Sequence, residues 1–196
     1  GAEMLAERPG DARLELFTGV FYNQFGQYNE SIKYLDQAEA HSPNKQQILF
    51  QVGLTNLQRG DPAAALAPLK KAFDLAPQYK DARLFYAMGL FFAGEKQSAD
   101  ALLIEGFGTV LLDDDRLLQI YANTKQFDRV IAIWNGRVEK TPNNPDLHLG
   151  LAGAYFAAGN NTATIAELEK VAELKPDSAA QMQSLISQIR AGTLKP

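Results

Sequence analysis

The chain of 196 residues carries few side chains that could do chemistry. It has no cysteine, which excludes disulfides, cysteine-ligated metal centres and thiol catalysis. Its two histidines, His41 and His148, are far apart and in no metal-ligand spacing. Three consecutive aspartates at 113–115 offer the oxygen ligands that calcium or magnesium prefers, but no companion acids follow at loop spacing. We favour a structural role, in which one aspartate caps a helix and the others lie at its positive end. A bound cation remains the alternative.

Other motifs give no stronger sign of catalysis. The Gly106-Phe107-Gly108 stretch lacks the third glycine and the preceding strand of a dinucleotide-binding loop. No serine stands in the context of a nucleophile elbow. Glu167 is expected on a solvated helix face, and His148 is expected to be a partly buried structural residue. The sequence therefore predicts no catalytic residue, no metal site and no cofactor, and the protein is not expected to be an enzyme.

Charge and hydropathy exclude two further classes of partner for this segment. The 19 Lys and Arg residues against 23 Asp and Glu residues give a net charge of −4, and the basic residues are spread along the chain. Nucleic-acid binding is therefore not expected. The longest apolar run, near residues 101–112, is interrupted by Glu105 and two glycines. It is too short to span a bilayer, which takes about 20 residues.

The spacing of the prolines indicates how the chain is divided into structural elements. They include five at a regular spacing, separated by 34, 34, 65 and 34 residues: Pro9, Pro43, Pro77, Pro142 and Pro176. A period of 34, with one repeat shortened by three residues, accounts for all five. Internal repeats of this length are typical of helical arrays.

Other positions recur with the same period when each proline is taken as position 32. Positions 8 and 20 hold mostly small residues, as closely crossing helices require. Position 8 holds Gly19, Gly53, Ala87, Leu118 and Ala152. Position 20 holds Ser31, Ala65, Ala99, Val130 and Thr164. Position 24 holds a large apolar residue in every repeat: Leu35, Leu69, Leu103, Trp134 and Leu168. Position 15 is mostly glycine: Gly26, Gly60, Gly94, Lys125 and Gly159. Glycine suits the left-handed residue that ends a helix. Each repeat is thus predicted to be a helix, a tight turn and a second helix ended by proline.

This arrangement over residues 1–178 resembles the tetratricopeptide repeat family. The resemblance implies an all-α solenoid of about five helix-turn-helix repeats and a C-terminal capping helix. We expect repeats at 11–45, 46–79, 80–113, 114–144 (shortened) and 145–178, and a capping helix with a tail at 179–196. The fourth repeat departs from the pattern, with Leu118 and Arg137 where small residues are expected, so the groove geometry of the family does not carry over to this repeat.

Both ends of the chain and the segment after the third repeat are expected to depart from the regular repeat. Residues 1–10 are expected to hold a cloning scar, Gly1-Ala2, and the end of a truncated preceding repeat, which makes the chain a fragment of a longer protein. At the other end, a helix from Ala179 to Arg190 with a polar outer side is expected to cover the array. Because two glycines cost roughly 2 kcal/mol inside a helix, the second helix of the third repeat should end near Gly106, leaving 109–112 extended.

In the tetratricopeptide family the first helices line a concave groove through positions 2, 5, 9, 12 and 13. The resemblance therefore implies a protein- or peptide-binding scaffold. The candidate groove residues are Leu16, Val20, Asn23, Phe50, Leu54, Leu84, Met88, Phe91, Gln119 and Asn123. An apolar strip of this kind favours an extended peptide or a helix as partner. Packing of the apolar members between repeats is the alternative. Leu16 and Leu84 stand where carboxylate-clamping arrays carry lysine or arginine, so such a clamp is not expected.

Three stretches are similar to a narrower group: 42–48, 121–134 and 189–196 resemble the C-terminal repeat regions of bacterial O-antigen ligase or polymerase-like membrane proteins. That resemblance implies a soluble module, tethered to a bacterial inner membrane through an upstream region, beside a glycan-assembly enzyme. Two other functions stay open, an architectural module that associates with itself and, as a less favoured one, a carbohydrate-binding or enzymatic role. The identity of the partner does not follow from the sequence.

Overall fold

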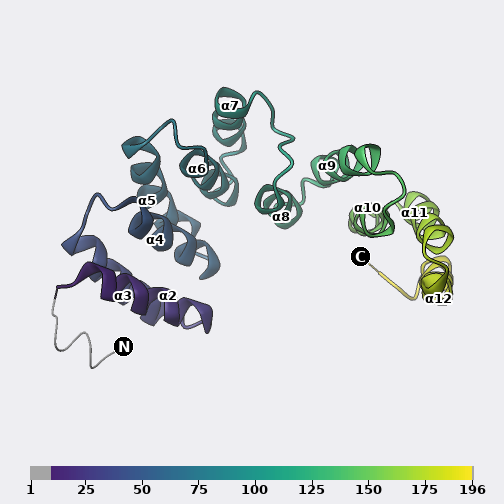
Figure 1. Ribbon diagram of the computed structural model, residues 1–196, viewed down its shortest axis with the longest axis horizontal. Coiled ribbons are helices and arrows are strands. Elements are labelled where there is room, and N and C mark those ends of the chain that lie inside the picture. The colour runs from purple at the N-terminus through teal and green to yellow at the C-terminus, as the bar shows by residue number, and fades with distance from the viewer. Residues whose placement is uncertain (1–9, 196) are drawn as a thin grey trace. The chain divides into compact units, whose positions relative to one another are not determined.

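The computed structural model describes residues 10–195, and every regular element within that range is a helix (Figure 1). The chain divides into two compact units, one ending at Val110 and the next beginning at Leu111. Unit 1 contains three helix pairs: α2 (Ala12–Gln24) with α3 (Tyr28–His41), α4 (Gln46–Gln58) with α5 (Pro62–Leu75), and α6 (Lys80–Phe92) with α7 (Lys96–Phe107). Unit 2 contains α8 (Asp115–Asn123) with α9 (Phe127–Lys140), α10 (Pro145–Ala157) with α11 (Asn161–Leu174), a 3₁₀ turn (Pro176–Ser178) and α12 (Ala179–Arg190). The predicted all-α array of paired helices with a C-terminal helix is confirmed.

The turn inside each pair has the backbone conformation that the sequence predicts. The residue at position 15 has a positive φ in all five pairs: Gly26 69°, Gly60 82°, Gly94 82°, Lys125 57° and Gly159 76°. Only glycine adopts this left-handed conformation without cost from a Cβ atom. The lysine of the fourth pair therefore takes up a strain that its four equivalents avoid.

Paired helices cross closely where the sequence places small residues. A Cβ atom added to Gly19 would lie 2.7 Å from Leu35 Cγ, and one added to Gly53 would lie 2.4 Å from Leu69 Cγ. Both leucines are position-24 residues, and both are fully buried. The first helix of each of these repeats thus leaves room for the large side chain of the second, as ridge-into-groove packing requires.

The fourth helix pair and the segment before it are irregular, as expected. Helix α7 ends at Phe107 because Gly108 adopts φ 71°, and residues 109–114 form no helix. Helix α8 has 9 residues, whereas the first helices of the other pairs have 13. The first helix of this repeat is thus four residues shorter than the others, which accounts for the three residues missing from the repeat.

Helix α12 closes the C-terminal end of unit 2. Its residues Met182, Ile186 and Ile189 are buried in one cluster with Leu168 and Val171 of α11. The residues on its opposite side are exposed and polar: Gln181, Gln183, Ser187, Gln188 and Arg190. The predicted capping role is therefore confirmed.

The structure does not test the predictions for the N-terminal residues. The assignments of Gly1-Ala2 as a scar and of the segment around Pro9 as the end of a preceding repeat lie outside the described residues. Among residues 10–195, no helix is both long and apolar enough to cross a membrane.

Candidate functional site

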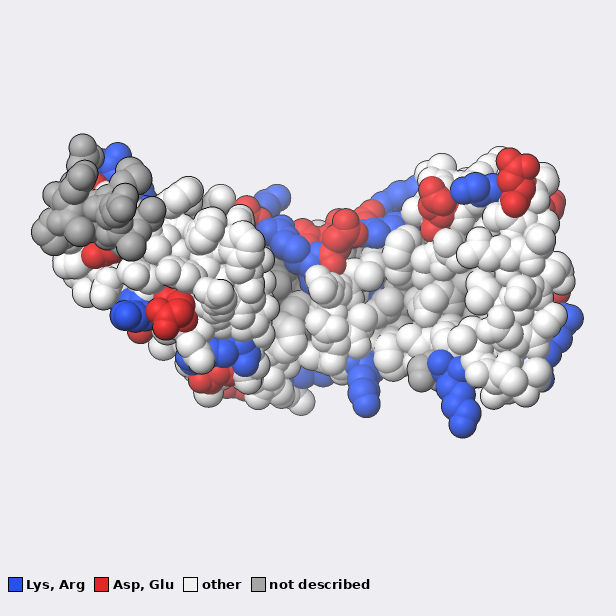
Figure 2. Space-filling view, turned by 90° about the horizontal axis from the view of Figure 1, so that it is seen from below, with Lys and Arg blue, Asp and Glu red and all other residues white. Residues whose placement is uncertain are grey.

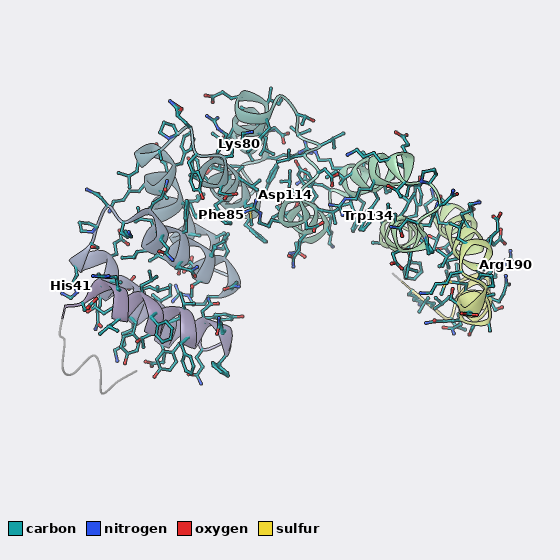
Figure 3. The ribbon with its side chains drawn as sticks, viewed as in Figure 1. His41, Lys80, Phe85, Asp114, Trp134 and Arg190 are labelled. Atoms are coloured by element: carbon teal, nitrogen blue, oxygen red, sulfur yellow. The ribbon has the colours of Figure 1, made fainter. Side chains whose placement is uncertain are left out.

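The first-helix face of unit 1 holds an aromatic hollow around Phe50. Its volume is about 560 Å³, and it is lined by Gln46, Gln47, Phe50, Ala76 and Tyr79. The ring of Phe50 lies 6.4 Å from that of Tyr79 and 5.1 Å from that of Phe85, which Figure 3 labels on α6. Gln47 and Phe50 occupy positions 2 and 5 of their repeat. The hollow therefore lies at positions that the family resemblance assigns to the groove, with aromatic walls and amide side chains at its rim.

Polar groups join the first helices of repeats 1 and 2 near the C-terminal ends of α2 and α4. The Asn23 Nδ2 amide donates to Thr55 Oγ1 at 2.8 Å and to Gln58 Oε1 at 2.6 Å. Val20 and Leu54 are half-buried on the same helices. Asn23 was expected to face a partner, but its amide nitrogen is already engaged inside the unit and holds α2 to α4.

Four predicted groove residues are core residues in the structure. The exposed fractions of Leu84, Met88 and Phe91 are 2%, 8% and 4%, and that of Leu16 is 9%. Their apolar side chains pack inside the array, as the alternative allowed for such residues. Contact with a partner would need them to leave the core, so we no longer count them as contact residues.

Unit 2 contributes exposed polar residues and one apolar pocket. Gln119 and Asn123, the two candidates on α8, are exposed. The pocket, which we call the α10–α12 pocket, has a volume of about 150 Å³. It is lined by Leu149, Ala152, Gly153, Phe156, Thr164, Leu168, Leu185, Ile189 and Leu194. Leu149 is 43% exposed, and a Cβ atom added to Gly153 would meet no atom within 4 Å, so the pocket is open on this side.

The groove positions of the repeat pattern supply only one wall of this pocket. Leu149, Gly153 and Phe156 stand at positions 5, 9 and 12 of their repeat, which belong to the groove pattern. Leu185, Ile189 and Leu194 come from the capping helix and the segment after it, which we had expected to serve as a cover alone. The signal was present in the apolar spacing of Leu185 and Ile189, four residues apart on α12.

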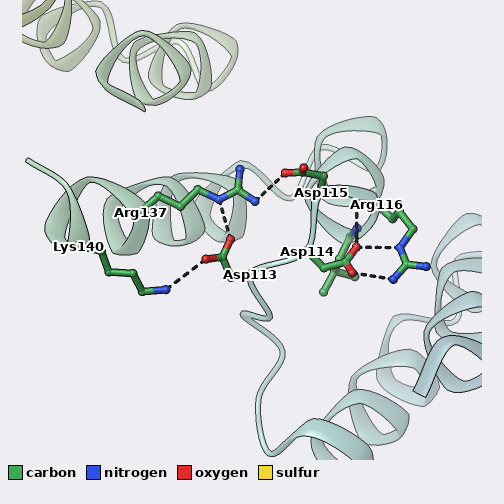
Figure 4. A network of polar contacts seen from close by, with 7 residues as sticks. Asp113, Asp114, Asp115, Arg116, Arg137 and Lys140 are labelled. Carbon is green, nitrogen blue, oxygen red and sulfur yellow. Dashed lines mark hydrogen bonds and ion pairs between the residues drawn. The ribbon is translucent and has the colours of Figure 1, made fainter. Parts of the chain in front are cut away.

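The three consecutive aspartates are bound to basic side chains of unit 2 (Figure 4). Asp114 caps α8 and accepts from the backbone nitrogens of Arg116 and Leu117. Arg137 Nε donates to Asp113 at 2.7 Å and its Nη2 to Asp115 at 2.7 Å, while Lys140 donates to Asp113 at 3.2 Å. The predicted helix cap is confirmed, and the other two carboxylates pair with α9.

These contacts lower the pKa of two of the three aspartates. The hydrogen bonds from Arg137 and Lys140 lower the pKa of Asp113, and the hydrogen bond from Arg116 lowers that of Asp114. Arg137 occupies a position where a small residue was expected, and its guanidinium lies 4.8 Å from the ring centre of Trp134. The charged network thus accommodates the large residue that makes the fourth repeat atypical.

Both histidines have structural contacts. His148 is buried, with Nδ1 2.6 Å from Glu167 Oε2 and Nε2 2.8 Å from the carbonyl oxygen of Pro142. His41 lies at the end of α3 (Figure 3), with Nδ1 2.8 Å from the buried carboxylate of Glu15. The prediction for His148 is confirmed, whereas the solvated position expected for Glu167 is wrong because its carboxylate is bound to that ring.

A third hollow lies on the second-helix side of unit 1. It has a volume of about 400 Å³ and is lined by residues of α3, α4, α5 and the turn between α4 and α5, which include Asp36, Glu39, Arg59 and Lys71. Burial and the nearby Glu39 raise the pKa of Asp36. Because acids and bases face each other across this cleft, it offers no surface of a single charge. The face drawn in Figure 2 likewise carries charges of both signs among wide uncharged areas.

Comparison with protein families identifies the repeats. Two models described as tetratricopeptide repeat match residues 22–80 and 125–189, which together make up more than half of the chain. Each match falls on one of the two units.

Solved structures share the fold at low sequence identity. MamA of Desulfovibrio magneticus RS-1 superposes with a TM-score of 0.58 at 20% identity, covering 85% of this chain and 96% of that protein. A tetratricopeptide repeat protein of Parabacteroides merdae gives 0.63 at 17% identity, covering 89% and 73%. YrrB, described as a TPR protein with an unusual peptide-binding site, gives 0.54 at 14% identity, covering 93% and 96%.

One curated relative is much longer than this chain. The CTR9 homolog of Arabidopsis thaliana is 22% identical over 187 residues, which make up 89% of this chain and 17% of that protein. The chain therefore spans less than a fifth of that relative.

Proposed function

Because the chain belongs to the tetratricopeptide repeat family, we propose that it is a protein-binding scaffold whose α10–α12 pocket holds an apolar anchor of a peptide or helix. The observation that carries this proposal is an open, apolar hollow at groove positions 5, 9 and 12. Exposed apolar hollows with few polar groups are typical of binding sites.

The size and lining of the pocket indicate which side chain of a partner would fit into it. A cavity of about 150 Å³ lined by aliphatic and aromatic side chains accepts a group the size of benzene. The pocket offers Leu149 and Phe156 from α10, Leu185 and Ile189 from α12, and no charged side chain. A leucine, methionine or phenylalanine side chain is therefore the expected anchor, and a charged one is disfavoured because it would lose its hydration.

The hollow around Phe50 adds a second kind of contact. Its aromatic walls suit the flat faces of proline or aromatic residues, and the exposed Gln47 supplies an amide for the backbone of an extended segment. Each hollow belongs to a different unit, so each is proposed as a site in its own right. Support for peptide recognition also comes from YrrB, a protein of similar fold described as having a peptide-binding site.

A pocket-filling substitution tests the proposal directly. Gly153→Leu places a side chain in the pocket, and there is space for its Cβ atom. Gly136→Leu on α9 is the matched control, since a Cβ atom added there also meets nothing within 4 Å and the position is outside the pocket. The probe is a phage-displayed library of random 12-residue peptides, selected on the unmodified chain.

We expect the selected peptides to share an apolar residue, to bind Gly136→Leu normally, and to lose at least about tenfold in affinity for Gly153→Leu. Calorimetry measures the affinities, and circular dichroism checks the fold of both variants. Equal affinity for the two variants would move the binding site away from the pocket. A library that yields no binding peptide would count against the scaffold itself.

The biological setting rests on sequence resemblance alone. We propose that the chain serves a bacterial surface-glycan assembly protein, tethered to an inner membrane, because of the stretches 42–48, 121–134 and 189–196. Fractionation of cells that make the intact parent protein would test this setting: recovery in the membrane fraction supports it, and recovery only in the soluble fraction overturns it.

A further inference from the structure

The hollow on the second-helix side of unit 1 separates α3 from α5, and we call it the α3–α5 cleft. Both helices pack against α4, but among the described helices the backbones of α3 and α5 do not come into close contact with each other. The space left between them has a volume of about 400 Å³. Its lining residues are spaced by three or four along each helix and so share one side of it: Ile32, Asp36 and Glu39 on α3, and Ala64, Ala67, Pro68 and Lys71 on α5.

Half of the cleft lining is apolar. Five of the ten lining residues have hydrocarbon side chains and come from all three helices: Ile32, Val52, Ala64, Ala67 and Pro68. A surface of this kind accepts the aliphatic stem of a long side chain while the polar end of that side chain stays near the rim.

The two bases of the cleft are already bound to other side chains. Lys71 Nζ donates to Glu39 Oε1 at 3.1 Å, across the space between α5 and α3. Arg59 Nη2 donates to Asn56 Oδ1 at 2.9 Å and to Asp61 Oδ2 at 3.2 Å. Each base therefore has a carboxylate as its partner, and neither is left to neutralise a further acid.

Asp36 is the acid that remains. Among residues 10–195, no hydrogen bond or ion pair joins its side chain to another residue. Burial and the nearby Glu39 raise the pKa of Asp36, while Arg59 acts in the opposite direction without forming an ion pair. The ionised carboxylate thus lies in a setting that disfavours its charge, which a cation bound beside it would relieve.

The α5 wall offers a second acceptor. Pro68 lies inside α5 and has no N–H to donate to the carbonyl oxygen of Ala64, four residues earlier. Both residues line the cleft. The carbonyl of Ala64 therefore lacks the donor that a regular helix would supply, and backbone carbonyls without that donor favour another hydrogen-bond donor nearby.

We propose that the α3–α5 cleft binds a lysine side chain of a partner protein, whose ammonium group pairs with Asp36. The apolar residues receive the four-carbon stem, and the three donors of the ammonium group suit acceptors on different walls. A single ion pair at a partly exposed carboxylate stabilises a complex only slightly. The lysine is therefore expected to belong to a protein segment whose neighbouring residues add further contacts.

This inference does not depend on the binding sites proposed above. The α3–α5 cleft shares no lining residue with the α10–α12 pocket or with the hollow around Phe50. Binding of an apolar anchor and binding of a lysine can therefore fail separately.

Peptide selection on the full chain gives the first test. The probe is a phage-displayed library of random peptides of about 12 residues with lysine fixed at the centre. Peptides that also bind Asp36→Asn are removed, which discards those held by other sites. The matched control is Asp74→Asn, which removes the same charge from an aspartate of α5 that does not line the cleft.

We expect the affinity of the selected peptides, measured by calorimetry, to fall at least about fivefold in Asp36→Asn and to stay within about twofold in Asp74→Asn. Replacing the peptide lysine by norleucine, which keeps the stem without the charge, should cause a similar loss. A library that yields no such peptide, equal affinity of the two variants, or undiminished binding of the norleucine peptide would overturn the inference.

Nuclear magnetic resonance gives a second test, which locates the site and separates a partner's lysine from a free amine. In the ¹⁵N-labelled full chain, a selected peptide should shift the amide signals of Ile32, Asp36 and Ala67. The second probe, n-butylammonium chloride, should shift the same signals only at concentrations at least about a hundredfold higher, because it lacks the neighbouring contacts. Peptide shifts confined to other residues, or saturation by both probes at similar concentrations, would overturn the inference.

Discussion

The first and last helices of the described chain, α2 and α12, differ in the polarity of their exposed side chains. Helix α12 turns Met182, Ile186 and Ile189 into the core of unit 2 and shows glutamines, serines and an arginine to solvent. Helix α2 buries Leu16 but shows Phe17, Phe21 and Phe25. A polar exterior suits a helix that ends an array, whereas an aromatic exterior is typical of a helix face that packs against another element. Covered and uncovered positions must therefore be distinguished before an apolar pattern is interpreted as core or as interface.

The largest contrast between the two ends is expected from a charge placed on each helix. Ile186→Asp puts a carboxylate at a position that is 1% exposed, and it should cost more than about 3 kcal/mol because the charge is buried without a partner. Phe21→Asp, at a position 49% exposed, should cost less than about 1 kcal/mol. Urea unfolding followed by circular dichroism measures both. Similar losses for the two variants would show that Phe21 belongs to the core of unit 1.

Glycine substitutions sharpen the distinction between covered and uncovered positions inside the helices. Gly53→Ala should destabilise unit 1 by about 1–3 kcal/mol, because its Cβ atom would lie 2.4 Å from Leu69 Cγ. Gly153→Ala should stabilise unit 2 by about 0.5–1 kcal/mol, because its Cβ atom meets nothing and alanine favours a helix. Thermal unfolding of the two variants gives the signs. A stabilising Gly53→Ala would mean that Leu69 moves aside without cost.

A smaller effect is expected at an uncovered turn. Lys125 has φ 57°, a conformation that costs a residue with a Cβ atom roughly 1 kcal/mol. Lys125→Gly should therefore raise the stability of unit 2 by up to about 1 kcal/mol, in a thermal melt compared with the unmodified chain. Lys125→Ala is the control, since it removes the same charge but keeps the Cβ atom. If alanine and glycine act alike, the gain comes from charge and not from backbone conformation.

The smallest expected effect concerns the aspartate network and its pH dependence. The lowered pKa of Asp113 means that its carboxylate binds a proton less readily in the folded protein than in the unfolded chain. Its contribution to stability is then present above the ordinary aspartate pKa of about 3.9 and is lost as the pH falls through the lowered folded value. Because Asp113 is half exposed, we expect less than about 1 kcal/mol.

Asp113→Asn should remove this part of the acid dependence, as measured by urea unfolding between pH 2 and pH 6, on either side of the ordinary value. An acid dependence identical to that of the unmodified chain would show that the pairing with Arg137 and Lys140 does not contribute.

The fold could be predicted because it depends on local rules that repeat. The left-handed turn at Gly26, the close crossing of Gly19 with Leu35 and the cap at Asp114 each follow from one residue type in one place. Five approximate copies of the pattern made these signals stronger than any single copy. The irregular stretch after Gly108 followed from the same rules, since glycines interrupt a helix.

The candidate site was predicted less well because burial depends on neighbours that no local pattern names. Met88 and Phe91 look like groove residues by position, yet other side chains cover them. The α10–α12 pocket was missed in part because one wall comes from α12 and Leu194, outside the repeats. Asp36 received no role, since it stands on a second helix and the groove positions of a repeat belong to the first helices.

The turns inside the helix pairs favour a residue of a particular chirality. At Gly26, Gly60, Gly94 and Gly159 a Cβ atom would meet no atom within 4 Å, so these positions disfavour L-residues through backbone conformation and not through lack of space. A residue of the opposite chirality prefers positive φ for the same steric reason that an L-residue avoids it. D-alanine introduced at Gly60 by chemical ligation should therefore fit the turn better than L-alanine, and the array would accept mirror-image building blocks at the places where its helices reverse direction.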